Sequence, residues 1–358
     1  MWILFSSLFV LAAACYLLFM SSEQLEKTSN RICRLLHIPE DVGASTIGAF
    51  ATSGPEILMA IIAASTVFLN SGWEVLGLGE KASSGTLNMA FSAMDNLIGI
   101  GCVGIIFMIW KGYMDKDEKI ELSPASVLGL ASYFIASVLF FIFILDGIFT
   151  ATEGKVMMWV GGVFIAMQFA MPFIRKKLGD DGDDEDDDEE EEEPLPTTAG
   201  KYLGELVKSG FVYAFLVFLL VVLVRECMGA SFSLATIGIV SLGGILLAVT
   251  SYVSSFPEFM LTYRYAIANK RGALLGMLFG SNVIDLAFSG FRSVWLNEDV
   301  AIYTTGTMPE LLPFYIAALP LIALVALITI QMGLVRYKIA YPMMVFYIAY
   351  IGSGLFLL

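Results

Sequence analysis

Two short stretches of similar sequence place a glutamate inside a long apolar run, directly after a proline. They read TSGPE at 52–56 and SSFPE at 254–258. A charged side chain at membrane depth costs roughly 2.5 to 3.5 kcal/mol on insertion scales. A chain that accepts this cost twice in one sequence context is expected to bind a cation there.

The residues before each glutamate are suited to a hard cation. Proline has no N–H, so we expect backbone carbonyls near Ala49 and Thr52 to lose their helical partners and become ligands. The hydroxyls of Thr52 and Ser53 add neutral oxygens, and Glu56 adds charge. Calcium needs six to eight oxygens at about 2.3 to 2.6 Å, so two facing halves would be needed. The second half repeats the pattern with Ser254, Ser255 and Glu258.

A second polar cluster follows each glutamate. It reads SAMDN at 92–96 and GSNVID at 280–285. Four residues separate the serine from the last polar residue in each cluster, so both lie on one helical face and can point at one site. Hydrogen bonding between helices is the alternative role for the serines, whereas acids within a membrane are functional by default. The pairs are Ser92 with Asn96 and Ser281 with Asp285.

Composition places the chain in a membrane. It is 58% hydrophobic and 15% charged, with a mean hydropathy of +0.79. A hydrocarbon core of about 30 Å needs roughly 20 apolar residues per helix. We therefore predict an all-α polytopic membrane protein with ten transmembrane helices. They lie near 2–20, 40–69, 84–110, 124–146, 156–174, 203–224, 233–267, 273–291, 308–332 and 339–358.

The charged residues indicate where the chain divides into two halves and how it is oriented in the membrane. Thirteen acids lie between Asp180 and Glu193, and such a tract is typical of a disordered linker. We place this linker at 176–200, between five-helix repeats at 1–175 and 201–358. With the N-terminus outside, sixteen of the twenty lysines and arginines fall in cytoplasmic connections. The linker is then cytoplasmic, where it could bind a regulatory partner.

Five helices per repeat have a topological consequence. The two Pro-Glu stretches enter the membrane from opposite sides, so the halves are inverted repeats. This architecture places substrate and coupling ions near the midplane, where the halves meet.

The sequence disfavours several other functions. Its four cysteines form no C-x-x-C pair, and its one histidine, His37, lies in a short polar connection. Histidine-rich metal centres and a Ser-His-Asp triad are therefore excluded. We predict no enzymatic activity, no cofactor and no nucleic-acid partner.

The paired motifs resemble those of the sodium/calcium exchanger family of the calcium/cation antiporter superfamily, over essentially the whole chain. The resemblance implies exchange of sodium for calcium by alternating access, with helices 2–20 and 203–224 sliding over the others. It implies a central ion-binding set of Glu56, Asn96, Glu258 and Asp285. It also implies flanking sodium ligands at Ala49, Thr52, Ser53, Ser92, Ser251, Ser254, Ser255 and Ser281.

Departures from the family pattern leave alternatives open. The first half carries 13 extra residues after Glu56, which we place within 70–84, outside the membrane. Phe91 replaces a glycine, Ser254 replaces a threonine, and Asp95 adds an acid that points about 100° from Asn96 on a helix. A calcium/proton exchanger is the main rival, potassium co-transport remains open, and an ion sensor without transport is a third reading.

Overall fold

The structure is a computed structural model, almost entirely helical where it describes the chain. Most of the predicted helices 308–332 and 339–358, the acidic tract, the 70–84 insertion, Pro55 and Phe91 lie outside the described residues. Within the described part, four helices are long and apolar enough to cross a membrane, at Pro124–Phe143, Ala151–Ile174, Gly200–Leu220 and Arg271–Leu296. The described residues are 2–54, 56–57, 89–90, 92–93, 95–96, 101–111, 122–178, 199–235, 251–301, 316–318, 320–322, 324, 342–346, 348–350 and 352.

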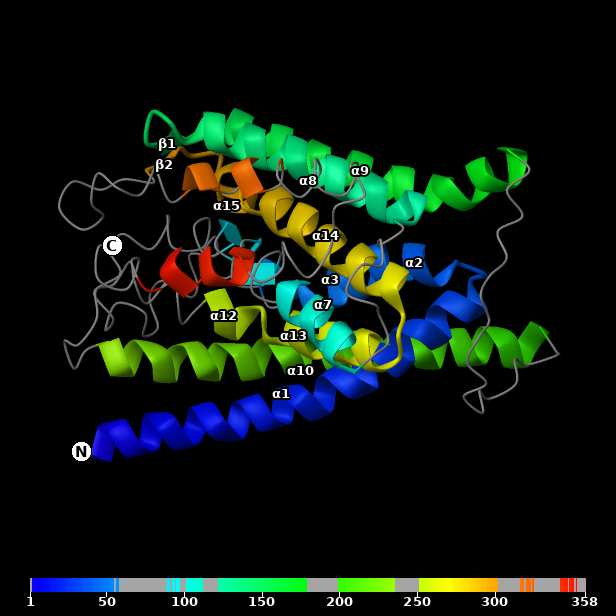
Figure 1. Cartoon of the computed structure of the whole chain (residues 1–358), viewed down its shortest axis with the longest axis horizontal. Coiled ribbons are helices and arrows are strands. Elements are labelled where there is room, and N and C mark those ends of the chain that lie inside the picture. Colours follow the sequence, from blue (N-terminus) through cyan, green and yellow to red (C-terminus); the bar gives the residue numbers. More distant parts are fainter. Residues whose placement is uncertain are drawn as a thin grey trace.

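Two long helices from different halves of the sequence lie side by side. They are α1 (Trp2–Leu35) and α10 (Ala199–Ala235), which run along the bottom of Figure 1. Both exceed the predicted spans 2–20 and 203–224, because good helix formers continue the helices through polar sequence. Arg31 Nε donates to Glu205 Oε1 at 2.9 Å and ties the two helices together.

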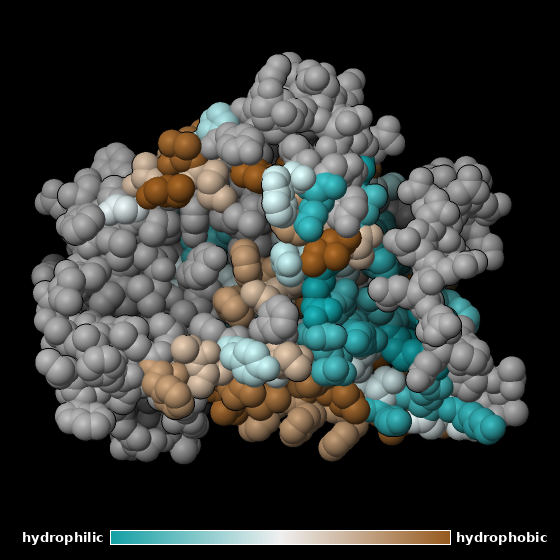
Figure 2. Space-filling model, turned by 60° about the horizontal axis from the view of Figure 1, so that its bottom comes forward, coloured by the Kyte–Doolittle hydropathy of each residue, from teal (hydrophilic) through white to brown (hydrophobic). Residues whose placement is uncertain are grey.

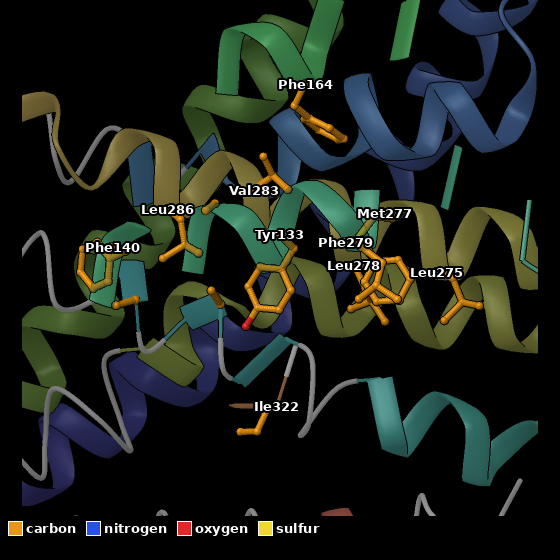
Figure 3. Close-up of a cluster of buried hydrophobic side chains, with 14 of the residues drawn as sticks. Tyr133, Phe140, Phe164, Leu275, Met277, Leu278, Phe279, Val283, Leu286 and Ile322 are labelled. Carbon is orange, nitrogen blue, oxygen red and sulfur yellow. The ribbon is translucent and has the colours of Figure 1, made fainter. Parts of the chain in front are cut away.

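A layer of two antiparallel helices covers a third. The helices α8 (Pro124–Phe143) and α9 (Ala151–Leu178) pack on α14 (Arg271–Phe288). Helix α8 begins at a serine cap, where the Ser126 N–H donates to Ser123 Oγ at 3.2 Å, and proline follows as the first helical residue. Figure 3 shows Tyr133, Phe164 and Val283 of these three helices in one buried apolar cluster.

The other face of α14 packs against an irregular helical segment. This segment consists of α2 (Glu40–Gly43), the π-helical turn η1 (Ala44–Gly48) and α3 (Ala49–Thr52). A Cβ on Gly276 would lie 2.9 Å from the Asp41 carbonyl oxygen, and one on Gly280 would overlap the Ser45 carbonyl. Glycines four residues apart therefore let the two backbones touch, as small residues do between membrane helices.

Both Pro-Glu stretches break their helices at corresponding serines. The first break follows α3 at Ser53, where φ is −75° and ψ is 1°. The second lies between α12 (Ser251–Ser254) and α13 (Phe256–Ile267), where Ser255 has φ −80° and ψ 7°. Since Ser53 and Ser255 each stand three residues before the glutamate, the two halves share one local design.

Two further short helices and a strand pair belong to the described fold. Helix α7 (Gly101–Trp110) packs against α13, and α15 (Phe291–Leu296) packs against α9. The strands β1 (Ile148–Phe149) and β2 (Val300–Ala301) pair antiparallel. They join two connections that the sequence predicts on the same side of the membrane.

Charged residues gather at the opposite end of the molecule from the strands. Arg264 of α13 pairs with Glu23 at 2.8 Å and with Glu26 at 3.3 Å, both on α1. Lys270 pairs with Glu40 at 2.8 Å. Figure 2 shows the described hydrophilic residues collected toward this end, with hydrophobic residues in a band beside them. The connections predicted to be cytoplasmic thus meet at one end.

Candidate ion-binding site

Every residue predicted to bind an ion lies in the interior with no exposed surface. The set draws on α3, α12, α13 and α14, on the π-helical position 96, and on positions 53, 56, 92 and 255. Burial of so many polar groups is costly unless they bind one another or a ligand. The buried residues are Ala49, Thr52, Ser53, Glu56, Ser92, Asn96, Ser251, Ser254, Ser255, Glu258, Ser281 and Asp285.

The Ser92 hydroxyl links the two halves of the sequence. Its oxygen donates to Glu56 Oε1 at 3.0 Å and lies 2.5 Å from Ser255 Oγ. Ser92 and Glu56 lie in the first half of the sequence, whereas Ser255 lies in the second. The predicted meeting of the two motif sets at one place is therefore observed here.

Asn96 makes the corresponding link from the other side. Its Nδ2 donates to Ser281 Oγ at 2.9 Å and more weakly to Asp285 Oδ2 at 3.4 Å. Ser281 in turn donates to Glu258 Oε1 at 3.4 Å. The expectation that residues four apart share a face is confirmed, since Ser281 and Asp285 both meet Asn96.

Negative charge is concentrated where the two halves of the sequence meet. Glu258 and Asp285 lie close enough to repel a charge on Glu56. The hydroxyls of Thr52 and Ser53 lie beside the Glu258 carboxylate, so the first half of the sequence supplies neutral oxygens to the acid of the second half. A bound cation would relieve this repulsion.

Five buried oxygen atoms around this centre have no hydrogen-bond partner among the described residues. They come from one hydroxyl, one amide and three carboxylates, and they belong to both halves of the sequence. Unsatisfied buried acceptors are rare in proteins and call for an explanation such as an ion. The atoms are Ser53 Oγ, Glu56 Oε2, Asn96 Oδ1, Glu258 Oε2 and Asp285 Oδ1.

The acids alone do not form a compact metal centre. Within the part of the chain that the structure describes, no three His, Cys, Asp or Glu side chains are grouped to hold a metal ion. A hard cation at this place would take a mixed set of carboxylate, hydroxyl, amide and carbonyl oxygens, which suits sodium and calcium.

One expectation about the backbone is wrong. The Ala49 carbonyl keeps its helical partner, since the Ser53 N–H donates to it at 2.9 Å, and Thr52 Oγ1 donates to it at 3.1 Å. An α-helical carbonyl bonds to the N–H four residues on, so Pro55 removes the donor for residue 51 and not for Ala49. Any ion contact of the Ala49 carbonyl must use its remaining lone-pair capacity.

The sequence did not reveal two contacts near the site. Asp95 Oδ2 accepts a hydrogen bond of 2.6 Å from Ser251 Oγ, so this extra acid meets a residue from the second half of the sequence. Tyr213 of α10 donates from its hydroxyl to the Ile47 carbonyl oxygen at 2.7 Å, within η1. Tyr213 carries the one side-chain hydroxyl in the run 211–222, and this lone polar group is the signal that could have found the contact.

Comparison with known proteins identifies the family. Residues 6–171 match the family model described as sodium/calcium exchanger protein. The matched segment, just under half of the chain, belongs to the sodium/calcium exchanger family. This match and the apolar helices support a multi-pass membrane protein related to cation antiporters, and the match agrees with the resemblance carried by the paired motifs.

Solved structures extend the likeness beyond the matched segment. The sodium-calcium exchanger NCX_Mj soaked with 2.5 mM Na+ and 10 mM Sr2+ is 17% identical, with a TM-score of 0.66 over 98% of this chain and 99% of that one. The same exchanger soaked with zero Na+ and Ca2+ is 16% identical, with a TM-score of 0.63 over 97% and 98%. The exchanger fold thus spans both halves of the chain. A search of curated proteins found no match.

Proposed function

We propose that this family member exchanges sodium for calcium across a membrane. The observation that carries the proposal is the convergence of five unpartnered buried oxygens from both repeats. Three of them belong to Glu56, Glu258 and Asp285, which lie near one another and repel when charged. Calcium or several sodium ions would supply the missing positive charge. NCX_Mj, which shares the fold, was soaked with sodium and with strontium or calcium.

The twelve buried residues named above are the proposed ligands. Glu56, Asn96, Glu258 and Asp285 form the centre, where calcium would contact mainly the two glutamates. Sodium ions would use the flanking hydroxyl and carbonyl oxygens, which overlap with the calcium ligands. Because the same carboxylates serve both ions, calcium and a full set of sodium ions exclude each other, and exclusion couples the two fluxes.

Alternating access is proposed to come from α1 and α10. These helices pack on each other along their length, and α10 meets the ion-binding segment at few points. One is the Tyr213 hydrogen bond to the Ile47 carbonyl. Another is the contact of Val217 with Gly54, where a Cβ added to the glycine would lie 2.7 Å from Val217 Cγ1. Sliding of this pair past the site would change which side of the membrane the ions can reach.

The topology completes the proposal. We infer ten helices in two inverted repeats, an outside N-terminus and a cytoplasmic acidic linker. The strand pair at one end and the ion pairs at the other support this arrangement, because each gathers connections predicted on one side.

The test uses the full chain in liposomes. Calcium uptake is followed under an outward gradient of sodium, potassium or protons, one at a time. We expect sodium to drive uptake, and we expect Glu258→Gln to lower the rate at least tenfold, because it removes one central charge while keeping size. Glu298→Gln removes an exposed acid away from the site and should behave like the original protein.

The outcomes separate the candidate functions. Uptake driven by protons and not by sodium would identify a calcium/proton exchanger. An additional requirement for potassium would place potassium among the transported ions. Absence of calcium flux under every gradient, with calcium binding retained, would point to an ion sensor and overturn the exchange proposal.

A further inference from the structure

The ion pairs of Arg264 cross the boundary between the helix pair proposed to slide and the part that carries the ion site. Arg264 belongs to α13 and follows the central acid Glu258 by six residues. Its guanidinium lies 2.8 Å from a Glu23 oxygen and 3.3 Å from a Glu26 oxygen, both on α1. The three side chains are between 14% and 28% exposed, so water screens the pairs only in part. One arginine thus ties α1 to the helix that carries Glu258.

The sequence of α1 allows both pairs together in one register only. Glu23 and Glu26 are the only acids between residues 2 and 35, and they stand one turn apart on one face. The residues from 8 to 20 before them are apolar, whereas basic residues follow at 27, 31 and 34. A slide of one turn, about 5.4 Å, would break one pair, and a slide of two turns would break both. Arg264 would then face apolar side chains in one direction and like charges in the other.

The pair of Arg264 with Glu23 is ionised at neutral pH. The hydrogen bond from Lys27 and the charge of Arg264 hold the pKa of Glu23 below its ordinary value of 4.5. The arginine side chain stays protonated in proteins. Sliding of α1 therefore has to separate full charges that are partly shielded from water.

We propose that Arg264 is a positioning residue that holds α1 in the register of this structure and keeps the cytoplasmic end of the exchanger closed. This inference rests on the proposed exchange function and deepens it, because it names a residue that sets the balance between the two access states. Arg264 lies at the end predicted to be cytoplasmic. Its release therefore favours opening of the buried ion site toward the cytoplasm.

The experiment measures the calcium concentration that half-saturates exchange, separately at the cytoplasmic and the outer face, in vesicles of each orientation. A larger inward-open population raises the calcium affinity measured at the cytoplasmic face and lowers it at the outer face. We expect Arg264→Gln to change the ratio of the two half-saturation values by about 2- to 30-fold, since it removes two partly exposed ion pairs. A general loss of stability would lower the rate at both faces and leave the ratio unchanged.

Further variants separate pairing from packing. Glu23→Gln combined with Glu26→Gln removes the acids and should match Arg264→Gln, which keeps the test available if the arginine variant does not fold. Arg264→Glu alone should shift the ratio in the same direction. Its combination with Glu23→Lys and Glu26→Lys reverses both pairs and should return the ratio toward the original value.

Two other ion pairs at the same end provide matched controls. Glu205→Gln breaks the pair with Arg31, which joins α1 to α10, and these helices are proposed to move together. Lys270→Gln breaks the pair with Glu40, which lies within the part that carries the ion site. Neither pair crosses the sliding boundary, so both variants should keep the original ratio.

The outcomes have distinct meanings. An unchanged ratio in Arg264→Gln and in the double glutamine variant, with exchange retained, would overturn the proposal. An equal shift in the two controls, or a shift that the charge reversal fails to restore, would also overturn it. Absence of calcium flux in the unaltered chain under every gradient would instead refute the exchange function itself.

Discussion

Replacement of Gly280 by alanine tests how the site is held. The added Cβ would overlap the Ser45 carbonyl oxygen and lie 2.8 Å from its carbon and 3.0 Å from Ser45 Cα. Ordinary contact requires a separation of about 3.5 Å, so α14 must move away by about 1 Å. All three atoms belong to the backbone and no side-chain rotation can relieve the overlap. We expect a loss of about 1 to 3 kcal/mol in unfolding free energy.

The movement should also disturb ion binding. Ser281 follows Gly280 directly and receives the 2.9 Å hydrogen bond from Asn96. A shift of about 1 Å would lengthen it beyond the usual limit of about 3.2 Å. Calcium affinity should therefore fall together with stability, although Gly280 itself offers no ligand side chain.

The assay is thermal unfolding of the purified protein with and without calcium, together with calcium uptake. For a chain of this length, about 1 to 3 kcal/mol corresponds to a Tm lower by roughly 1 to 4 °C. Gly162→Ala on α9 is the matched control, because a Cβ there meets nothing within 4 Å. It should stabilise the helix by up to about 1 kcal/mol. Equal Tm values and equal uptake for the two variants would refute the close backbone contact.

Two further predictions concern single side chains. Ser92→Ala removes the hydrogen bond to Glu56 and the contact with Ser255. Calcium binding should therefore weaken by about 1 to 3 kcal/mol, which is roughly 5- to 150-fold in a calcium titration. An unchanged calcium affinity would contradict the role of Ser92 in the ion-binding site. Burial raises the pKa of Cys33 from 9.0 to about 12, so in a variant with Cys15, Cys102 and Cys227 replaced by serine the folded protein should resist maleimide at pH 8 and react once denatured. The pKa of Cys33 is higher in the folded protein than in the unfolded one. The thiol therefore contributes to stability below about pH 9, and this contribution is lost as the pH rises toward 12. Rapid labelling of the folded protein would contradict this environment.

The sequence predicted which residues lie in the interior better than which contacts they make. Spacing of four residues placed Ser281 and Asp285 on one face, and both meet Asn96. Such periodicity is local and can be read from one segment. The contact of Asp95 with Ser251 joins residues 156 positions apart, and it depends on how the repeats cross. No single-segment pattern encodes that crossing.

The backbone details were harder to predict for a similar reason. Proline correctly predicted a broken helix, and the breaks fall at Ser53 and Ser255. The π-helical turn Ala44–Gly48 was not foreseen, because its sequence is compatible with an ordinary helix. The glycines at 276 and 280 became meaningful only with their neighbours, Asp41 and Ser45, in view.

The hydrogen bonds of Ser92 also determine which group donates its proton at each contact. A hydroxyl carries one proton, and Ser92 gives its proton to Glu56, so Ser255 must be the donor in the contact between the serines. On the other side the first donor is the Asn96 amide, which Asp285, its counterpart in the second repeat, cannot replace while ionised. The two halves of the sequence therefore have similar helix breaks but unequal polarity. An ion at this centre would meet a chain of serine hydroxyls on the Ser92 side and an amide beside a carboxylate on the Asn96 side, which gives the site two chemically different sides.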